Sequence, residues 1–306
     1  MLDHRVATFL AVYRRRSFTQ AGRELNLTQP AVSQHIRQVE AHYGCRLFCK
    51  GGRSVTPTPA ADLLFQALNT AQNDETRLMA EIKELERTDA ASATSGRKLV
   101  FGCTRTVGDA VVPPLIAQHA AAHPDDRITM RIDNTACLVQ LLDEGTIDFA
   151  LVEGSFDRKR FDAELLSHEE YIAVAAPAVA ATLPPSEQRT LTDLLACRLV
   201  LREAGSGTRE ILERLLAAHD RTVADFAGTI ELGGMPAIVE AAAAGCGVAF
   251  LYQVAAKGAL VSGALVDVTP IDCHLTHDFC LIWQHGSRYA PRWRALAHSW
   301  RSARNS

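Results

Sequence analysis

Polar side chains that could read DNA recur along one side of a predicted helix near the start of the chain. Val32, Ile36 and Val39 repeat at helical spacing, and Tyr43 extends this predicted buried face by one turn. At about 100° per residue, the opposite side carries amide, hydroxyl and guanidinium groups, which can bind base edges or phosphates. The residues on that outer side are Pro30, Ser33, Gln34, Arg37 and Gln38, with Gln29 at the N-terminal tip.

Two shorter helices are predicted to hold this helix in place. An apolar stripe predicts a first helix over about residues 3–16, formed by Val6, Phe9, Leu10 and Tyr13. Ser17 and Gln20 form a capping-box pattern, so a second helix begins there and ends near Leu25. Thr28 can cap the third helix, whose first turn tolerates a proline because no hydrogen bond is lost there.

A wing-like β-hairpin is predicted after the three helices. Two extended runs flank Gly51 and Gly52, and glycine readily takes the positive φ of a hairpin turn. Residues 1–57 hold nine Lys/Arg against three Asp/Glu, whereas the remainder holds 23 against 32. Such a local basic patch attracts the phosphate backbone of double-stranded DNA. The residues predicted to contact DNA are Ser17, Thr28, Gln29, Pro30, Ser33, Gln34, Arg37, Lys50 and Arg53.

A three-helix packing module with a solvated polar face is the alternative interpretation of this segment. The helix pattern, the charge and the hairpin together favour DNA binding over that alternative. Residues 1–66 resemble the N-terminal domain of LysR-type transcriptional regulators through the run FLAVYRRRSFTQAGRELNLTQPAVSQHIRQVEAHYGCRLF, followed by R-x-V-x-x-T-P-A. Two departures from the family pattern are Pro57-Thr58-Pro59-Ala60-Ala61, where Leu-Thr-x-Ala-Gly is usual, and the cysteines at 45 and 49. The resemblance implies a winged helix-turn-helix fold.

A long linker helix is predicted over residues 58–88, with the narrow apolar seam of a coiled coil. Its members are Ala61, Leu64, Leu68, Ala71, Glu75, Leu78, Ile82 and Leu85, and only the glutamate breaks the pattern. Pairing two chains along the seam would place two DNA-binding heads on a palindromic site. A helix packed on its own domain is the alternative. The resemblance implies the dimer and adds a homotetramer of two dimers, with RNA polymerase as a further candidate partner.

Residues 89–98 are small and polar and predict a hinge, after which the pattern changes to alternating strands and helices. This alternation over residues 99–306 predicts a parallel sheet with helical crossovers. The predicted strands are LVFGC, ITMRI, DFALVEG, YIAVAAP, RLVLRE, TIEL, GVAFL and FCLIW. Ligands on such sheets bind beyond the carboxyl ends of the strands, where helices begin.

Four strand-to-helix junctions carry suitable chemistry for that position. They are residues 104–108, Asn134-Thr135, residues 205–208 and residues 233–236, with Glu153-Gly154 bordering them. If the junctions converge, exposed amides and helix dipoles make an electropositive pocket for a small anion or carboxylate. Each junction alone is more often an ordinary cap or glycine turn.

A second resemblance covers residues 99–290, which are similar to the effector-binding domain of LysR-type regulators. The fold implied is that of type 2 periplasmic binding proteins, with two Rossmann-like α/β subdomains flanking a cleft. It implies lobe I over residues 99–168 and 268–306, and lobe II over residues 169–267. The motifs ALVEG, DNT and REAGSGTR most resemble regulators of carbon fixation and sulfur assimilation. The predicted effector-binding residues are Thr104, Arg105, Thr106, Asn134, Thr135, Glu153, Gly154, Ser206, Gly207, Thr208 and Met235.

Arg105 is unusual in this set, because small residues are common there in the family. It either pairs with an anionic effector or points away from the pocket.

Cysteine and histidine residues raise two further alternatives. The eight cysteines lack a C-x-x-C motif, so no disulfide framework is expected, and redox sensing through Cys103 with Cys137, or through Cys197, is a minor alternative. The run from Cys273 to Cys280 holds residue types that zinc favours. Its histidines are three apart and would face opposite sides of an extended strand, so no metal site is expected.

An enzyme is the rival functional class. The chain of 306 residues contains no G-x-S-x-G, H-E-x-x-H or dinucleotide fingerprint, so neither catalytic residues nor a cofactor are expected. A freestanding solute-binding protein is disfavoured by the basic N-terminal segment and by the absence of a signal-peptide pattern. No apolar run predicts a membrane span. The sequence therefore predicts a cytoplasmic DNA-binding transcriptional regulator whose promoter binding is controlled by a small anionic effector.

Overall fold

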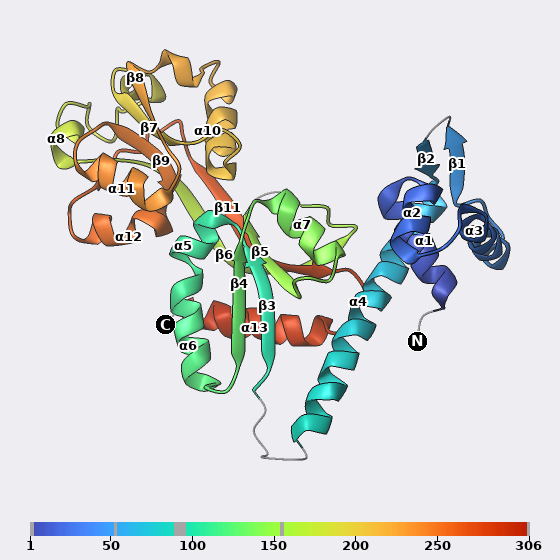
Figure 1. Ribbon diagram of the computed structural model, residues 1–306. Helices are drawn as coiled ribbons and strands as arrows, with labels where there is room; N and C mark the ends of the chain where they lie inside the picture. The colour runs from blue at the N-terminus through green and yellow to red at the C-terminus, as the bar shows by residue number, and fades with distance from the viewer. Residues whose placement is uncertain (1–2, 52–53, 89–95, 154–155, 305–306) are drawn as a thin grey trace.

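The computed structural model describes residues 3–51, 54–88, 96–153 and 156–304 (Figure 1). The N-terminal head consists of three helices and a hairpin. Its elements are α1 (His4–Arg15), α2 (Phe18–Leu25), α3 (Gln29–Tyr43), β1 (Phe48–Gly51) and β2 (Ser54–Pro57). The three helices lie within one residue of their predicted ends, which confirms the prediction from caps and periodicity.

Local caps explain why these helices begin where they do. The Ser17 hydroxyl accepts a hydrogen bond from the Gln20 amide at 3.3 Å, and the Thr28 hydroxyl accepts one from the Ala31 amide at 3.4 Å. The apolar stripes of all three helices meet in one core, which includes Phe9, Leu10, Val32, Ile36 and Val39. The predicted burial of Tyr43 is wrong: its side chain is 48% exposed, because the last turn of α3 extends beyond this core.

The hairpin pairs antiparallel, with Gly51 opposite Ser54. The side chain of Lys50 and the whole of Arg53 lie outside the described residues. After the hairpin, the Thr58 hydroxyl donates to the Arg46 carbonyl and accepts from the Ala61 amide. Thr58 therefore both ties the hairpin to α3's end and caps the helix that follows.

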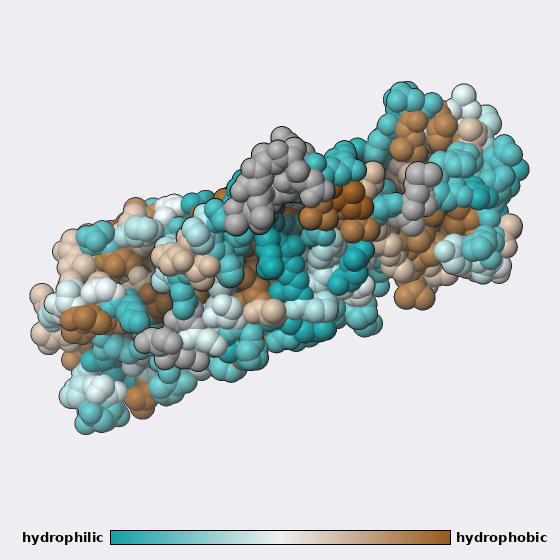
Figure 2. All heavy atoms as spheres, turned by 90° about the horizontal axis from the view of Figure 1, so that it is seen from below, coloured by the Kyte–Doolittle hydropathy of each residue, from teal (hydrophilic) through white to brown (hydrophobic). Residues whose placement is uncertain are grey.

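Helix α4 (Pro59–Thr88) runs from the head along the C-terminal α/β part (Figure 1). Its first turns pack into the core of the head through Ala61 and Phe65, joined by Leu64 and Leu68. The first part of the predicted seam thus packs on its own domain, as the alternative interpretation expected. Three large apolar residues further along the helix are exposed, namely Met79, Ile82 and Leu85. Seen from below, apolar surface gathers beside the end of α4 (Figure 2).

The α/β part contains the remaining elements. In the half nearer α4 these are β3 (Lys98–Cys103), α5 (Arg105–Ala110), α6 (Val112–Ala122), β4 (Arg127–Ile132), α7 (Thr135–Asp143), β5 (Phe149–Glu153) and α13 (Ala290–Arg304). In the other half they are α8 (Pro177–Ala180), α9 (Leu191–Leu194), β7 (Arg198–Arg202), α10 (Gly207–Ala218), η1 (Val223–Asp225), β8 (Gly228–Leu232), α11 (Met235–Ala243), β9 (Val248–Tyr252), α12 (Gln253–Val261) and β10 (Val266–Asp267). The two halves are joined by β6 (Phe161–Ala175) and β11 (Leu275–Gln284).

Within the described residues, the strands of the α/β part form one sheet in the order β4-β3-β5-β11-β6-β9-β7-β8, with β10 pairing β6. Strand β3 is parallel to β4 and β5, and β7 is parallel to β8 and β9. The long strands β6 and β11 run antiparallel between these two groups. The carboxyl ends of β3, β4 and β5 therefore share one edge, and those of β7, β8 and β9 share another.

Among all the described residues, from the head to α13, no helix is both long and apolar enough to cross a membrane.

Candidate functional site

The outer face of α3 presents the predicted DNA-contacting side chains. Thr28, Gln29, Pro30, Gln34 and Arg37 are all exposed, and α1 and α2 pack against the opposite side of the helix. The Gln29 amide donates to the half-buried Ser33 hydroxyl at 2.9 Å, which orders the first turn of this face. Ser17, which caps α2, is half-buried. This arrangement offers amide, hydroxyl and guanidinium groups on one side of a rigid helix, as major-groove recognition requires.

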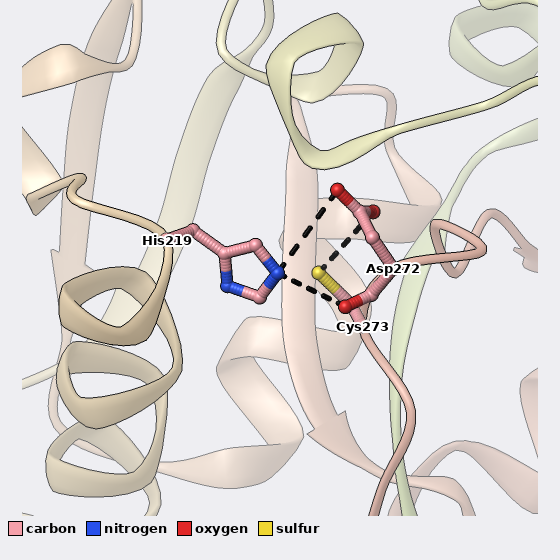
Figure 3. Close-up of side chains that lie close together, drawn as sticks. All are labelled: His219, Asp272 and Cys273. Atoms are coloured by element: carbon pink, nitrogen blue, oxygen red, sulfur yellow. Dashed lines mark hydrogen bonds and ion pairs between the residues drawn. The ribbon is translucent and has the colours of Figure 1, made fainter.

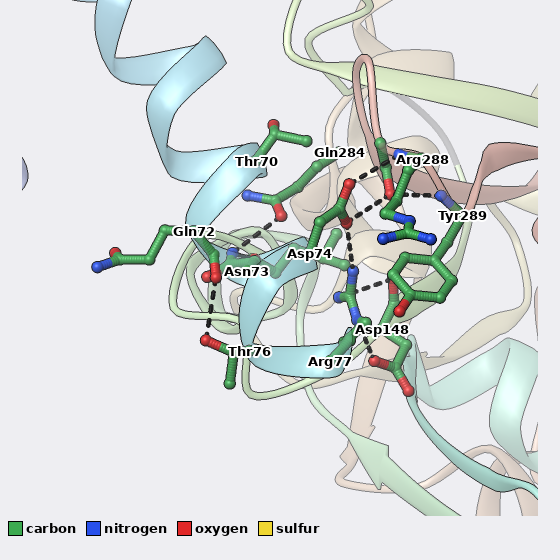
Figure 4. A network of polar contacts seen from close by, with 12 residues as sticks. Thr70, Gln72, Asn73, Asp74, Thr76, Arg77, Asp148, Gln284, Arg288 and Tyr289 are labelled. Atoms are coloured by element: carbon green, nitrogen blue, oxygen red, sulfur yellow. Dashed lines mark hydrogen bonds and ion pairs between the residues drawn. The ribbon is translucent and has the colours of Figure 1, made fainter. Parts of the chain in front are cut away.

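A buried polar network joins α4 to the α/β part (Figure 4). Asp74 accepts hydrogen bonds from the Ser287 hydroxyl at 2.8 Å and from the Arg288 amide at 2.7 Å. Arg77 pairs with both Asp74 and Asp148, and the Arg77 and Asp148 side chains are only 13% and 16% exposed. Such shielded and charge-assisted contacts fix the position of α4 against this part of the protein.

A second amide contact extends the network along α4. Asn73 donates to the Gln284 side chain at 2.9 Å (Figure 4). It also donates to the Leu142 carbonyl at 3.2 Å. Gln284 ends β11, and Leu142 lies on α7. The linker helix therefore contacts the strand and the helix that lead to the predicted effector residues.

Three predicted effector residues lie at one edge of the sheet, beyond the ends of β3, β4 and β5. Thr104 occupies the N-cap position of α5 without a side-chain capping hydrogen bond, and its backbone amide donates to the Leu151 carbonyl of β5 at 3.0 Å. Asn134 caps α7 by accepting from the Cys137 amide at 2.9 Å. Glu153 is the last residue of β5.

The two halves of the α/β part meet directly through predicted site residues. The hydroxyls of Thr106, on α5, and Thr208, on α10, lie 3.1 Å apart and are buried. A methyl group built on Gly207 would lie 3.6 Å from the Glu153 Oε1 atom, so the start of α10 lies against this carboxyl. Ser206, which precedes α10, is buried as well. Residues from three predicted junctions thus converge across the boundary between the halves.

Glu153 has an unusual environment for a carboxyl group. Burial raises its pKa from 4.5 to about 7, against the opposing effects of Arg202 and the Thr106 hydroxyl. Its Oε2 atom is shielded from solvent and has no hydrogen-bond partner among the described residues. Glu153 is therefore protonated in about half of the protein molecules near pH 7.

The remaining predicted residues are placed apart from this convergence. Arg105 is exposed and lies close enough to Glu203, directly after β7, to lower the pKa of that carboxyl. Asn134 is exposed and Thr135 is half-buried at the start of α7. Met235 is 2% exposed and packs in an apolar cluster on α11. Gly154 lies outside the described residues.

Sequence reasoning missed three residues near Glu153, namely Arg202, Tyr171 and Tyr252. Arg202, at the end of β7, is buried and forms an ion pair with Glu203 at 2.6 Å. The Tyr171 hydroxyl donates to the Thr208 carbonyl at 2.9 Å, and the Tyr252 hydroxyl contacts a ring nitrogen of His277 at 2.9 Å. A basic residue at the end of an otherwise apolar strand was the available signal for Arg202. The two tyrosines gave no such signal, because aromatic residues are common in buried strands.

The alternatives based on cysteine and metal chemistry find little support. Burial raises the pKa of the Cys103 thiol to about 12 and also raises the pKa of Cys197, and a hydrogen bond with Asp133 raises the pKa of Cys137. Reactive thiols, in contrast, have a lowered pKa. His219, Asp272 and Cys273 lie close together (Figure 3). However, both ring nitrogens of His219 contact backbone carbonyls, those of Leu215 and Asp272, so structural hydrogen bonds account for this cluster.

Comparison with known families covers nearly the whole chain. Residues 4–62 match the bacterial regulatory helix-turn-helix protein, lysR family, and residues 92–303 match the LysR substrate binding domain. The RuBisCO operon transcriptional regulator of Allochromatium vinosum is 30% identical over 217 residues, which cover 70% of this chain and 68% of that relative. The regulator CysL of Bacillus subtilis is 29% identical over 212 residues, covering 69% and 68%. Both relatives agree with the branch indicated by the sequence motifs.

The solved structures agree on the fold. Full-length LysG from Corynebacterium glutamicum, with bound effector Arg, superposes with a TM-score of 0.64 at 17% identity, covering 98% of each chain. Regulators of this family bind promoter DNA and small-molecule effectors, form oligomers and are not enzymes, which confirms the expected non-enzymatic class. The chain belongs to the LysR family of transcriptional regulators.

Proposed function

We propose that this chain is a cytoplasmic regulator that binds promoter DNA through α3 and the hairpin, under the control of a small effector in the interlobe cleft. The observation that carries this control is the connection made by α4. The helix begins in the head, and its buried Arg77 bonds Asp148 directly before β5. Strand β5 then ends at Glu153, beside the Thr106–Thr208 contact between the lobes.

The proposed effector is a small anion or carboxylate. The starts of α5 and α10 meet at the boundary between the lobes, where unpaired backbone amides favour negative charge. The proposed domains are the head (1–57), the linker helix (58–88), the hinge (89–98), lobe I (99–168 and 268–306) and lobe II (169–267).

Self-association through α4 is part of the proposal. The exposed Met79, Ile82 and Leu85 are the kind of apolar surface that a second copy of the same helix covers. Family membership extends this proposal to a homotetramer of two dimers and to RNA polymerase as a partner. An effector that binds more tightly to one arrangement of the two lobes would shift the protein toward that arrangement and so change the spacing of the heads. The size of the shift is limited by the difference between its affinities for the two arrangements.

The DNA-binding part is tested by fluorescence anisotropy with the chain's own upstream DNA. Arg37→Ala and Ser33→Ala each remove a group from the exposed face of α3, so we expect each to weaken binding by about 1–3 kcal/mol. Arg221→Ala is the matched control, because it removes an exposed arginine from the α/β part. Unchanged affinity in both head variants would overturn the assignment of this face.

The effector part is tested by thermal-shift screening with small carboxylates, phosphates and inorganic anions. A compound that binds the folded protein raises its melting temperature. We expect Thr104→Val and Ser206→Ala to abolish that shift, whereas Thr129→Val, at an exposed position on β4, keeps it. A shift that survives in both cleft variants places the pocket elsewhere.

A further inference from the structure

Two shielded polar atoms at the lobe boundary lack partners among the described residues. They are the Thr104 Oγ1 and Glu153 Oε2 atoms, at the carboxyl ends of the neighbouring strands β3 and β5. The Thr104 amide donates to the Leu151 carbonyl, two residues before Glu153, which places Thr104 beside the end of β5. Since buried polar groups are nearly always hydrogen-bonded, this pair marks a place for the polar atoms of a ligand.

The start of α10 lies against the same carboxyl. Gly207 begins this 12-residue helix, and a methyl group there would lie 3.6 Å from the Glu153 Oε1 atom. Ser206 occupies the cap position, but its side chain makes no capping hydrogen bond to the amides of the first turn. These amides and the helix dipole favour an anion next to Glu153, whereas an ionised Glu153 would repel it.

We propose that the cleft binds a small oxyanion or carboxylate together with one proton, which stays on Glu153 and forms a hydrogen bond to the ligand. This inference rests on the proposed effector cleft. In the bound state, the Glu153 Oε2–H and Thr104 Oγ1–H groups donate to oxygen atoms of the ligand, and first-turn amides of α10 add further donors. The protonated carboxyl removes the charge that would otherwise oppose the anion.

We assign the proton to Glu153 because the charged and titratable groups near it are paired, exposed or neutral. Arg202 on β7 is engaged by Glu203, and Arg105 on α5 is exposed. Burial raises the pKa of Tyr171 on β6 and of Tyr252 on β9, so both phenols stay neutral.

Two further titratable groups, His277 and Glu169, lie near Tyr252. Burial lowers the pKa of His277 on β11, so this imidazole is neutral near pH 7, and it bonds the Tyr252 hydroxyl. The carboxyl of Glu169 on β6 acts on Tyr252 but is not among the groups that shift the pKa of Glu153. The neutral His277 therefore does not compete with Glu153 for the proton near pH 7.

The test uses sulfate, nitrate and acetate as probes, because each keeps its charge between about pH 6 and pH 8.5. Their binding to the full-length protein is measured by isothermal titration calorimetry across this range. For at least one probe we expect the affinity to fall about tenfold per pH unit above pH 7, because only the protonated fraction binds. In Glu153→Gln, whose amide keeps a donor without titrating, the affinity stays at its low-pH value throughout.

Glu170→Gln is the matched control, since it makes the same charge change at an exposed position on β6 and should keep the wild-type pH profile. The proposal is overturned if none of the three probes binds the wild-type protein at about pH 6. It is also overturned if wild-type affinity does not change with pH, or if Glu153→Gln abolishes binding.

The outcome separates this inference from the proposed function. A cationic or neutral effector that controls promoter binding and needs Thr104 would overturn proton-coupled anion binding and leave the proposed control of promoter binding standing. Proton-coupled anion binding that leaves promoter affinity unchanged would support this inference and overturn the proposed control of DNA binding.

Discussion

The pKa of Glu153 links the stability of the α/β part to pH. Burial raises this pKa from 4.5 to about 7, so between these values the folded protein binds more protons than the unfolded chain. The stability contributed by the protonated carboxyl is complete below about pH 4.5 and is lost as the pH rises through 7. We expect Glu153→Gln to increase the free energy of unfolding by about 1–3 kcal/mol at pH 8.5 and to change it little at pH 5.

Urea denaturation of both proteins at the two pH values provides the measurement. Glu170→Gln, which removes an exposed carboxyl nearby, should alter stability equally and slightly at both. An equal effect of Glu153→Gln at pH 5 and pH 8.5 would mean that this carboxyl titrates at its ordinary value.

The first turns of α4 pack into the core of the head, whereas its second half exposes apolar side chains. We predict that this second half mediates self-association. Ile82 and Leu85 are 47% and 68% exposed, far more than apolar side chains in a core. We expect the double variant Ile82→Glu/Leu85→Glu to weaken self-association at least about tenfold, because like charges would face each other across the helix pair. Sedimentation equilibrium measures this change.

The control for this prediction is Lys83→Glu, which introduces the same charge at an exposed position between the two apolar residues. It should leave the oligomeric state nearly unchanged. If the double variant also keeps the wild-type oligomer, the copies associate through another surface.

The elements also show how far sequence patterns reach. Caps at Ser17 and Thr28 act within three residues, so the ends of α2 and α3 were predictable from neighbouring residues alone. Which side of α4 is buried was not predictable, because Asn73 and Asp74 are covered by residues more than 60 positions away. An apolar seam was visible in the sequence, whereas a buried polar face resembles a solvated one.

In the candidate site, too, features set by neighbouring residues were predictable, whereas contacts between distant residues were not. Thr104, Glu153 and Ser206 were proposed from the sequence because they stand at or shortly after the end of a strand-like run, where α/β folds bind ligands. The contributions of Arg202 and Tyr171 depend on strands that the fold brings beside β5's end from distant positions. Sequence spacing alone cannot show such contacts.

Across the whole molecule, the buried Arg77–Asp148 pair lies between the DNA-binding head and the proposed effector cleft. Strand β5 runs from Phe149, which follows Asp148, to Glu153 at the lobe boundary. A shift of this strand that accompanies ligand binding would reach α4 through the ion pair, because both side chains are shielded from water. The exposed pair between Arg127 and Glu84 joins the same two parts of the protein, with side chains 72% and 42% exposed.

These two pairs allow a matched test of coupling. Arg77→Ala leaves the shielded Asp148 carboxylate without its cationic partner, so we expect it to cost about 3 kcal/mol of docking energy, whereas Arg127→Ala costs less than about 1 kcal/mol. The measurement is the ratio of promoter affinities with and without a compound that stabilises the wild-type protein, since this ratio defines the coupling between the sites. It should approach one in Arg77→Ala and keep its wild-type value in Arg127→Ala. Limited proteolysis gives a readout that needs no ligand, because α4 should be cut faster only in Arg77→Ala. Equal behaviour of the two variants in both measurements would show that the buried pair does not link the cleft to the head.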